Sequence, residues 1–275
     1  MYSENTIPKH TRRATPSVAA FATIAAAAVA VTTAGIALFP HAAAQTPTPP
    51  LPAAPPITPV PLALPTQPPR GATVLLGGTG ATATKRLREN WYRRYTTQPG
   101  DWAIAPDGTC TPQKSDLTSR QEFGDCYLHA EFRTPAPAPG KPGTDGNSGI
   151  GFQGRYEVQI LGDYGTTPKK HGSAALYSQT ASAINASKPA GEWQTYDILF
   201  RAPRFDAEGK VSENPRVTVF HNGIPVQNNA AFTGMTGIQY GEYKEMTKTG
   251  PLVLQGDHDA VQYRNLWIIP LTTMP

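Results

Sequence analysis

Apolar and polar residues alternate through much of the chain, which is the pattern of strands that bury one face. The run RVTVFHNGIPVQ (Arg216 to Gln227) has Asn222-Gly223 at its middle, and this dipeptide is the strongest hairpin signal in the chain. CYLHAEFR and WQTYDILFRAPRF are further strand-like runs. Apart from segments such as TATKRLRENWYRRY, which fit a short helix, little of the chain has a helical period. The pattern therefore predicts an all-β fold.

Many antiparallel strands joined by short turns predict two sheets packed as a sandwich or jelly roll. In such a fold, one face of each sheet is buried against the other sheet. Because successive side chains of a strand point to opposite faces, alternation identifies the buried set. It assigns six residues to the core: Tyr156, Val158, Ile160, Tyr196, Ile198 and Phe200.

The first 44 residues have the features of an export signal peptide. Lys9, Arg12 and Arg13 form a basic start, and no charge follows between Val18 and Phe39. The sequence HAAAQ then predicts cleavage after Ala44. The alternative is an uncleaved membrane anchor, because these 22 uncharged residues could span a bilayer. We expect cleavage, which would give a secreted or periplasmic protein without a membrane span.

Residues 45–80 are predicted to be a proline-rich, disordered linker. The stretch from Thr46 to Pro69 holds 11 Pro in 24 residues. Proline fixes φ and lacks a backbone N–H, so this stretch is expected to be an extended spacer rather than part of a sheet. The alternative is a ligand for a proline-recognising domain. The folded domain is then expected over residues 81–275, a length that can bury a core of its own.

The charge balance argues against a nucleic-acid-binding protein. The formal net charge is +4, and the chain has no basic stripe and no run of like charges. No metal-binding motif is evident, so we expect no cofactor. A structural calcium ion stays open, because two loops offer oxygen ligands: Asp145, Asn147, Asp257 and Asp259.

The two cysteines, Cys110 and Cys126, lie 16 positions apart at the ends of a possible hairpin. Disulfides form in the oxidising compartments that exported proteins reach. We therefore predict a disulfide between the two residues, in preference to two free thiols.

The stretch SGIGFQGRYEVQILGDYG is the strongest candidate for a functional surface. If its apolar residues face the core, then Arg155, Glu157 and Gln159 share the opposite face, about 7 Å apart along the strand. A cation, a carboxylate and an amide in a row fit a sugar-binding or catalytic cleft. They also fit an ordinary solvated sheet face, and alternation alone does not separate the two.

Six blocks follow one another along the chain: DWAIAPDGTC, EFGDCYLHAEFRTP, GNSGIGFQGRYEVQILGDYG, GEWQTYDILFRAPRFDAEGK, RVTVFHNGIPVQNN and GPLVLQGDHDAVQYRNLWIIPL. Together they resemble the 3-keto-disaccharide hydrolase domain family, formerly a domain of unknown function, from about Trp91 to Leu271. The resemblance implies a concanavalin-like jelly roll of two curved antiparallel sheets. It also implies action on glycosides oxidised at C3. The loop near His258 departs from the family pattern.

A ketone at C3 makes the C2 hydrogen acidic, so a base can remove it and the C1 substituent can leave, after which water adds. We predict Glu157 as this base and Arg155 or Arg264 as the partner of the enolate oxygen. In related jelly-roll glucanases a second acid stands where this chain has Gln159. Its replacement by an amide favours elimination or binding over two-carboxylate hydrolysis. The alternative function is a non-catalytic carbohydrate-binding module.

His258 is the third predicted catalytic residue, because histidine transfers protons near neutral pH. Polar side chains at strand ends or on outward faces are predicted to bind the substrate: Gln159, Asn147, Gln255, Arg264 and Asp197. For each of them the alternative is a solvated surface or a purely structural contact. The expected partner is a carbohydrate, namely an oxidised glycoside or disaccharide.

Overall fold

The computed structural model of this chain describes residues 61–137, 139, 145–239 and 241–271. All of these belong to one compact unit, Pro56–Pro275. The predicted signal peptide and the first part of the predicted linker therefore lie outside the described residues. Within the described part of the chain, no helix has the length and apolar character needed to cross a membrane.

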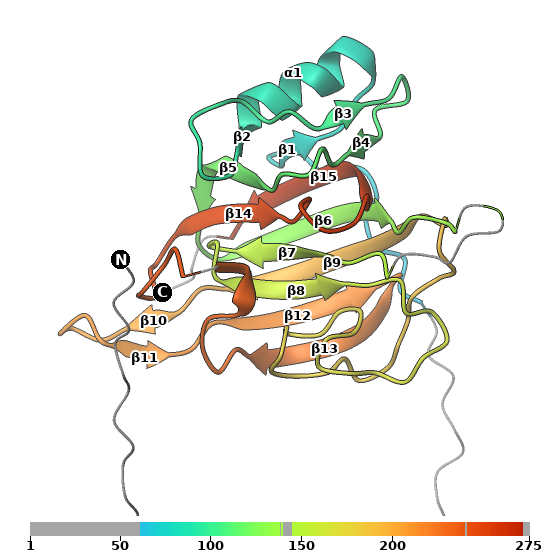
Figure 1. Cartoon of the computed structure of the whole chain (residues 1–275). Coiled ribbons are helices and arrows are strands. Elements are labelled where there is room, and N and C mark those ends of the chain that lie inside the picture. The colour runs from blue at the N-terminus through green and yellow to red at the C-terminus, as the bar shows by residue number, and fades with distance from the viewer. Residues whose placement is uncertain (1–60, 138, 140–144, 240, 272–275) are drawn as a thin grey trace, which may run out of the picture. The chain divides into compact units, whose positions relative to one another are not determined.

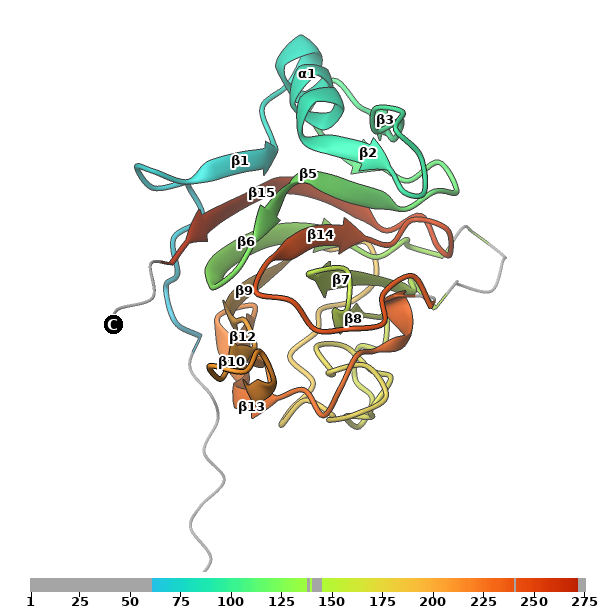
Figure 2. The same cartoon turned by 90° about the vertical axis from the view of Figure 1, so that its left-hand side faces the viewer.

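Two antiparallel sheets pack face to face, as the alternation predicts (Figure 1). The larger sheet contains, in spatial order, β13 (Ile224–Ala231), β12 (Arg216–His221), β9 (Gln194–Arg201), β6 (Cys126–Arg133), β15 (Gln262–Pro270), β4 (Cys110–Thr111) and β3 (Ala103–Ile104), with β1 (Thr73–Leu76) also paired to β15. The smaller contains β2 (Trp91–Arg93), β5 (Leu117–Phe123), β14 (Gly250–Leu254), β7 (Ser148–Phe152) and β8 (Tyr156–Ile160). In Figure 2, β14, β7 and β8 form one layer, to the right of β6, β9 and β12.

Four short elements complete the domain: α1 (Gly80–Asn90), β10 (Arg204–Phe205), β11 (Val211–Glu213) and the 3₁₀ turn η1 (Gly237–Gln239). The helix α1 overlaps the segment expected to fit a short helix, TATKRLRENWYRRY (Thr82 to Tyr95), but it begins two residues earlier and ends at Asn90, after which Trp91–Arg93 forms β2. The result is a jelly-roll sandwich, and the predicted all-β fold class is confirmed.

The core lies between the two sheets and contains the residues that alternation assigned to it. All six predicted core residues, from Tyr156 in β8 to Phe200 in β9, are at most 2% exposed. Phe152 of β7 stacks on Phe200 with ring centroids 4.6 Å apart, which joins the small sheet to the large one. The face of β8 that carries Glu157 therefore points away from this core.

The predicted hairpin joins β12 to β13. Asn222 has φ 52° and Gly223 has φ 76°, so both residues of the turn adopt the left-handed backbone that a tight hairpin turn needs. The Asn-Gly signal is confirmed.

The folded domain begins earlier than the predicted residue 81. Thr73–Leu76 forms β1, which pairs with β15 and buries Leu75 and Leu76. The preceding segment is also held: Leu62 N donates to the Gly223 carbonyl at 2.8 Å, and Asn265 Nδ2 donates to the Thr66 carbonyl at 2.6 Å. The sequence reading was wrong here because a four-residue stretch, TVLL, between proline-rich and glycine-rich stretches is too short to stand out as a strand.

The predicted disulfide does not form, since Cys110 and Cys126 are both free and buried. Cys110 pairs with Tyr263 of β15, whereas Cys126 pairs with Pro270 at the other end of the same strand. Seven residues of strand separate these positions by roughly 23 Å. Because a disulfide needs Cα atoms within about 7 Å, the prediction is wrong. Burial also raises the pKa of Cys110 to about 12, which makes its thiol unreactive.

Candidate functional site

Glu157 lies at the bottom of a pocket on the small sheet, on the face turned away from the core. The pocket has a volume of about 220 Å³ and is lined by Asn147, Glu157, Tyr177, Gly237, Gln255 and His258. Glu157 itself is only 2% exposed, so its carboxyl group is a buried group and not part of a solvated sheet face. Four of the predicted site residues thus meet in one place, although they come from three separate segments of the chain.

Glycines on the neighbouring strand make room for the carboxyl group and for its cover. A Cβ at Gly149 would lie 2.3 Å from Glu157 Oε1. A Cβ at Gly151 would lie 2.7 Å from Ile238 Cδ1, so the η1 turn packs directly on β7. The backbone N–H of Glu157 donates to Thr236 Oγ1 at 3.1 Å, which ties β8 to the same covering segment. Gly149 therefore makes the pocket deep enough for the carboxyl group, and Gly151 lets the η1 turn pack closely over the sheet.

Burial and nearby charges raise the pKa of Glu157 to about 8. Desolvation is the largest cause, and the carboxylates of Asp116 and Asp257 add to it, while Arg94 acts in the opposite direction. A carboxyl group with this pKa can hold or release a proton near neutral pH. Such a perturbed acid in a cleft is typical of a catalytic site.

Arg94 and Asp116 form a buried ion pair beside the pocket and hold its walls. Arg94 Nη1 lies 3.0 Å from Asp116 Oδ2, and Arg94 Nη2 donates to the Ile238 carbonyl at 2.6 Å. Asp116 Oδ1 accepts the backbone N–H groups of Gly256 at 2.9 Å and Asp257 at 3.3 Å. One ion pair therefore fixes both the η1 turn and the loop that carries His258.

Sequence reasoning missed Arg94, Asp116 and Tyr177. Arg94 and Asp116 follow no motif, and their partners are distant in the sequence. Tyr177 belongs to the short stretch SAALYSQ (Ser173 to Gln179), which does not form a strand. Instead it lies in a loop that returns to β8, where Tyr177 N donates to the Glu157 carbonyl at 3.2 Å. No local signal marks any of the three as a site residue.

Gln159 lies between Glu157 and Asn147, and its amide can serve either protonation state of the acid. With Nε2 turned toward Glu157, it donates to Glu157 Oε1 at 2.9 Å and its carbonyl faces the Asn147 amide. With the amide reversed, Nε2 donates to Asn147 Oδ1 at 3.0 Å and the Gln159 oxygen can accept the proton of a neutral Glu157. The predicted neighbour of Glu157 is thus in contact with it.

Arg155 does not line the pocket, and the prediction that it shares a catalytic face with Glu157 is wrong. It stands just before β8, after Gln153 and Gly154, whose positive φ angles break the alternation. Its guanidinium donates to the carbonyls of Gln153 at 2.6 Å and Glu245 at 2.7 Å, and it lies 4.0 Å from the centroid of the Tyr243 ring. Arg155 therefore holds the covering loop in place.

Asp197 and Arg264 were predicted to bind the substrate, but both lie on the large sheet, facing away from the core. Asp197 accepts hydrogen bonds from Tyr127 Oη at 2.6 Å and His129 Nδ1 at 2.7 Å. Arg264 Nε donates to Glu131 Oε2 at 2.6 Å. The prediction that they share a cleft with Glu157 is wrong, because alternation gives the face of a strand and not the sheet to which the strand belongs.

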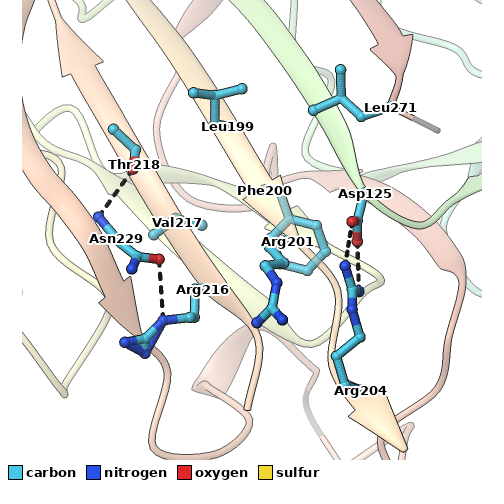
Figure 3. A pocket seen from close by; sticks show the side chains of 10 residues that line it. All are labelled: Asp125, Leu199, Phe200, Arg201, Arg204, Arg216, Val217, Thr218, Asn229 and Leu271. Carbon is cyan, nitrogen blue, oxygen red and sulfur yellow. Dashed lines mark hydrogen bonds and ion pairs between the residues drawn. The ribbon is translucent and has the colours of Figure 1, made fainter. Parts of the chain in front are cut away.

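A separate hollow of about 310 Å³ lies over β9 and β12 (Figure 3). Its three arginines already have partners: Arg204 is paired with Asp125, Arg201 with Glu213 at 2.7 Å, and Arg216 Nε with Asn229 Oδ1 at 3.1 Å. None of the predicted site residues lines it. The pocket of Glu157 is therefore the better candidate for a functional site.

Among the described residues, no group of three or more His, Cys, Asp or Glu side chains is arranged to hold a metal ion. Of the four oxygen ligands considered for calcium, Asp259 Oδ2 accepts the backbone N–H of Asn147 at 2.8 Å, which joins the two loops.

Comparison with known proteins places the folded domain in a family. A family described as the "3-keto-alpha-glucoside-1,2-lyase-like domain" matches residues 73–269. A provisionally assigned glycosyl hydrolase from Parabacteroides distasonis is 30% identical, with a TM-score of 0.61, over 79% of this chain and 94% of its own. A second from the same organism is 16% identical, with a TM-score of 0.50, over 74% and 95%. No curated protein matches the chain.

The matched segment begins at the first residue of β1 and ends within β15, so it covers both sheets and every residue that lines the pocket of Glu157. The family that the six sequence blocks resemble is thereby confirmed: the chain belongs to the 3-keto-alpha-glucoside-1,2-lyase-like domain family.

Proposed function

We propose that this protein is a carbohydrate-active enzyme that cleaves the glycosidic bond of 3-keto-glycosides, with Glu157 as the base. Membership of the family indicates a carbohydrate-active protein. The observation that carries the finer proposal is a single buried carboxyl group with a pKa raised to about 8, set in a pocket among amides and a histidine.

The proposed reaction begins with loss of the C2 proton to the Glu157 carboxylate. The electron pair of the C2–H bond forms the enolate of the C3 ketone. The ketone then re-forms as a C1–C2 double bond is made and the C1–O bond breaks, and the departing oxygen takes up a proton. Addition of water, with hydroxyl to C1 and a proton to C2, completes a net hydrolysis. Glu157 can return the proton that it removed.

The other pocket residues have roles that suit this sequence of steps. The side-chain amides of Asn147 and Gln255 are hydrogen-bond donors that could hold the C3 oxygen as negative charge develops on it. His258 is suited to protonating the departing oxygen. Arg94 lies close enough to lower the pKa of Glu157, which favours the ionised form that acts as the base.

The surroundings of Glu157 support elimination over hydrolysis by two carboxylates. The next outward position of the strand is Gln159, an amide. Asp116 forms an ion pair with Arg94 and accepts hydrogen bonds from two backbone N–H groups, so its role is structural. A retaining hydrolase would need a second available carboxylate about 5 Å away across the scissile bond.

The test is to incubate the full chain with 3-keto-trehalose and to measure sugar release. Wild type should release sugar, and Glu157→Gln should not. Glu122→Gln is the matched control, because Glu122 is an exposed carboxylate on the same sheet. No release by wild type, or full activity of Glu157→Gln, would overturn the proposal. Binding of the sugar without release would instead indicate a carbohydrate-binding module.

A further inference from the structure

We propose that the hollow beside the Glu157 pocket is the subsite for the departing sugar, and that Tyr95 is its stacking surface. This proposal rests on the proposed function and extends it, because it states what kind of leaving group the site selects. The subsite would favour a second pyranose ring over a small alcohol.

The two hollows are separated by one short loop. The second hollow has a volume of about 420 Å³ and is lined by Arg93, Arg94, Tyr95, Lys114, Ser115, Asp116 and Asp257. Asp257 is followed directly by His258, which lines the pocket of Glu157. Lys114 Nζ donates to the His258 carbonyl at 3.3 Å, so the rim of one hollow is bonded to the wall of the other. The segment Asp257-His258 therefore contributes one residue to each hollow.

Tyr95 presents an aromatic ring at this second hollow. The residue is 65% exposed, although tyrosine carries a large apolar surface that burial would normally cover. The Arg94 guanidinium lies 4.9 Å from the centroid of the ring. The Arg94 guanidinium forms ion pairs with the Asp116 and Glu242 carboxylates, each with an N–O distance of 3.0 Å. These ion pairs fix the position of the guanidinium that contacts the Tyr95 ring. An aromatic ring that is supported on one side and open on the other suits stacking against the C–H face of a sugar.

The backbone on both sides of the hollow adopts a conformation that side chains disfavour. Tyr95 has φ 62° and Lys114 has φ 60°, both in the left-handed region. A bulky residue there costs free energy, and such strain concentrates at ligand sites, where the position of the side chain matters. In the described structure this conformation turns Tyr95 outward at the rim of the hollow.

The polar groups of the hollow carry both signs of charge. Arg93 and Lys114 are hydrogen-bond donors, and the Asp257 carboxylate is an acceptor. This mixture suits the hydroxyl groups of a neutral sugar, each of which donates and accepts. The chemical class of the leaving group is therefore a neutral sugar.

The test compares two substrates that differ only in the leaving group, 3-keto-trehalose and methyl 3-keto-α-glucoside. Tyr95→Ala should raise KM for 3-keto-trehalose about tenfold and change that for the methyl glycoside less than about twofold. Tyr95→Phe keeps the ring and should behave as wild type. Tyr164→Ala removes a tyrosine that is 58% exposed and lines neither hollow, and it should change neither KM. Equal losses on both substrates, or none, would overturn the subsite.

A binding measurement separates this proposal from the proposed function. Calorimetric titration with unoxidised trehalose needs no turnover. Weaker binding by Tyr95→Ala than by wild type and Tyr164→Ala supports the subsite, even if no 3-keto-glycoside is cleaved. Equal binding by Tyr95→Ala and wild type, or no binding by wild type, contradicts it.

Discussion

The outward faces of the two sheets each carry a carboxyl group that is largely withdrawn from solvent, but the pKa values of these two groups shift in opposite directions. On the large sheet burial opposes ionisation, yet His129 at 3.9 Å and hydrogen bonds from Asn265 and Arg264 lower the pKa of Glu131 to about 2. On the small sheet burial dominates, and the pKa of Glu157 rises to about 8. Within the described part of the chain, no ion pair involves Glu157.

This difference separates a structural charge from a reactive one. Glu131 is a permanent anion whose partners cancel its charge, and its loss should cost stability. Glu157 lies where its proton is held and released near neutral pH, as an acid–base catalyst requires. The sequence shows acids beside cations on both strands, so only their contacts distinguish the two roles.

The largest expected effect comes from removing each carboxylate in turn. Glu157→Gln should lower kcat by about a thousandfold, the usual contribution of a general base. Glu131→Gln should leave kcat within about twofold but lower the free energy of unfolding by about 1–3 kcal/mol, because a charge-assisted pair is lost. Steady-state kinetics on 3-keto-trehalose and urea unfolding measure the two effects. An equal loss of activity in both variants would contradict the distinction between a reactive Glu157 and a structural Glu131.

A smaller effect is expected from filling the space that Glu157 occupies. Gly149→Ala places a Cβ about where Glu157 Oε1 lies, so the carboxyl group must move. A displacement of this size should lower kcat/KM by about a hundredfold. Gly234→Ala is the control, since its Cβ would meet nothing within 4 Å and its φ is not positive. If both variants are fully active, the position of the carboxyl group does not matter for the reaction.

The rate should also depend on pH as a base with this pKa requires. Only the ionised form of Glu157 can accept the C2 proton, so kcat/KM should rise about tenfold per pH unit and level off near pH 8. The charges of Asp116, Arg94 and Asp257 also act on Glu157. A rate that falls through pH 8 would mean that Glu157 acts as an acid.

The smallest effects are changes in the free energy of unfolding with pH. The outward faces of the two sheets should show these changes in different pH ranges. Folding raises the pKa of Glu157 above its usual 4.5, so the neutral form is favoured and stability falls as the pH rises from about 4.5 to 8. Glu157→Gln should remove this fall, which thermal unfolding between pH 5 and 8 can measure. An unchanged pH dependence in the variant would contradict the raised pKa.

On the large sheet the titrating group is a histidine. Burial alone would lower its pKa, but the hydrogen bond to Asp197 and the nearby Glu131 carboxylate raise the pKa of His129 to about 9. Its stabilising contribution is complete below about pH 6.5 and is lost as the pH rises to about 9. Asp197→Asn should reduce this loss without changing activity. A change in activity would place Asp197 in the site after all.

Several features could be predicted from sequence because they depend on neighbours in the chain. The hairpin at Asn222-Gly223 follows from two residues, and the core set around Val158 follows from alternation within one strand. The site was predicted in part: Glu157, Gln159, Asn147, Gln255 and His258 lie together, and alternation or loop position had pointed to each.

The remaining features could not be predicted because they depend on which strands become neighbours. Cys110 and Cys126 lie in one sheet but at opposite ends of β15, and nothing local fixes that register.

The sequence by itself determined the all-β fold, the faces of the strands and the family, since these rest on local periodicity and on the order of the blocks. Only the tertiary structure decided that Glu157 is buried, that Arg94 rather than Arg155 acts on it, and that Asp197 and Arg264 belong to another surface. The physical reason is that a pKa depends on desolvation and on charges within a few ångströms, and folding brings those groups together from distant parts of the chain.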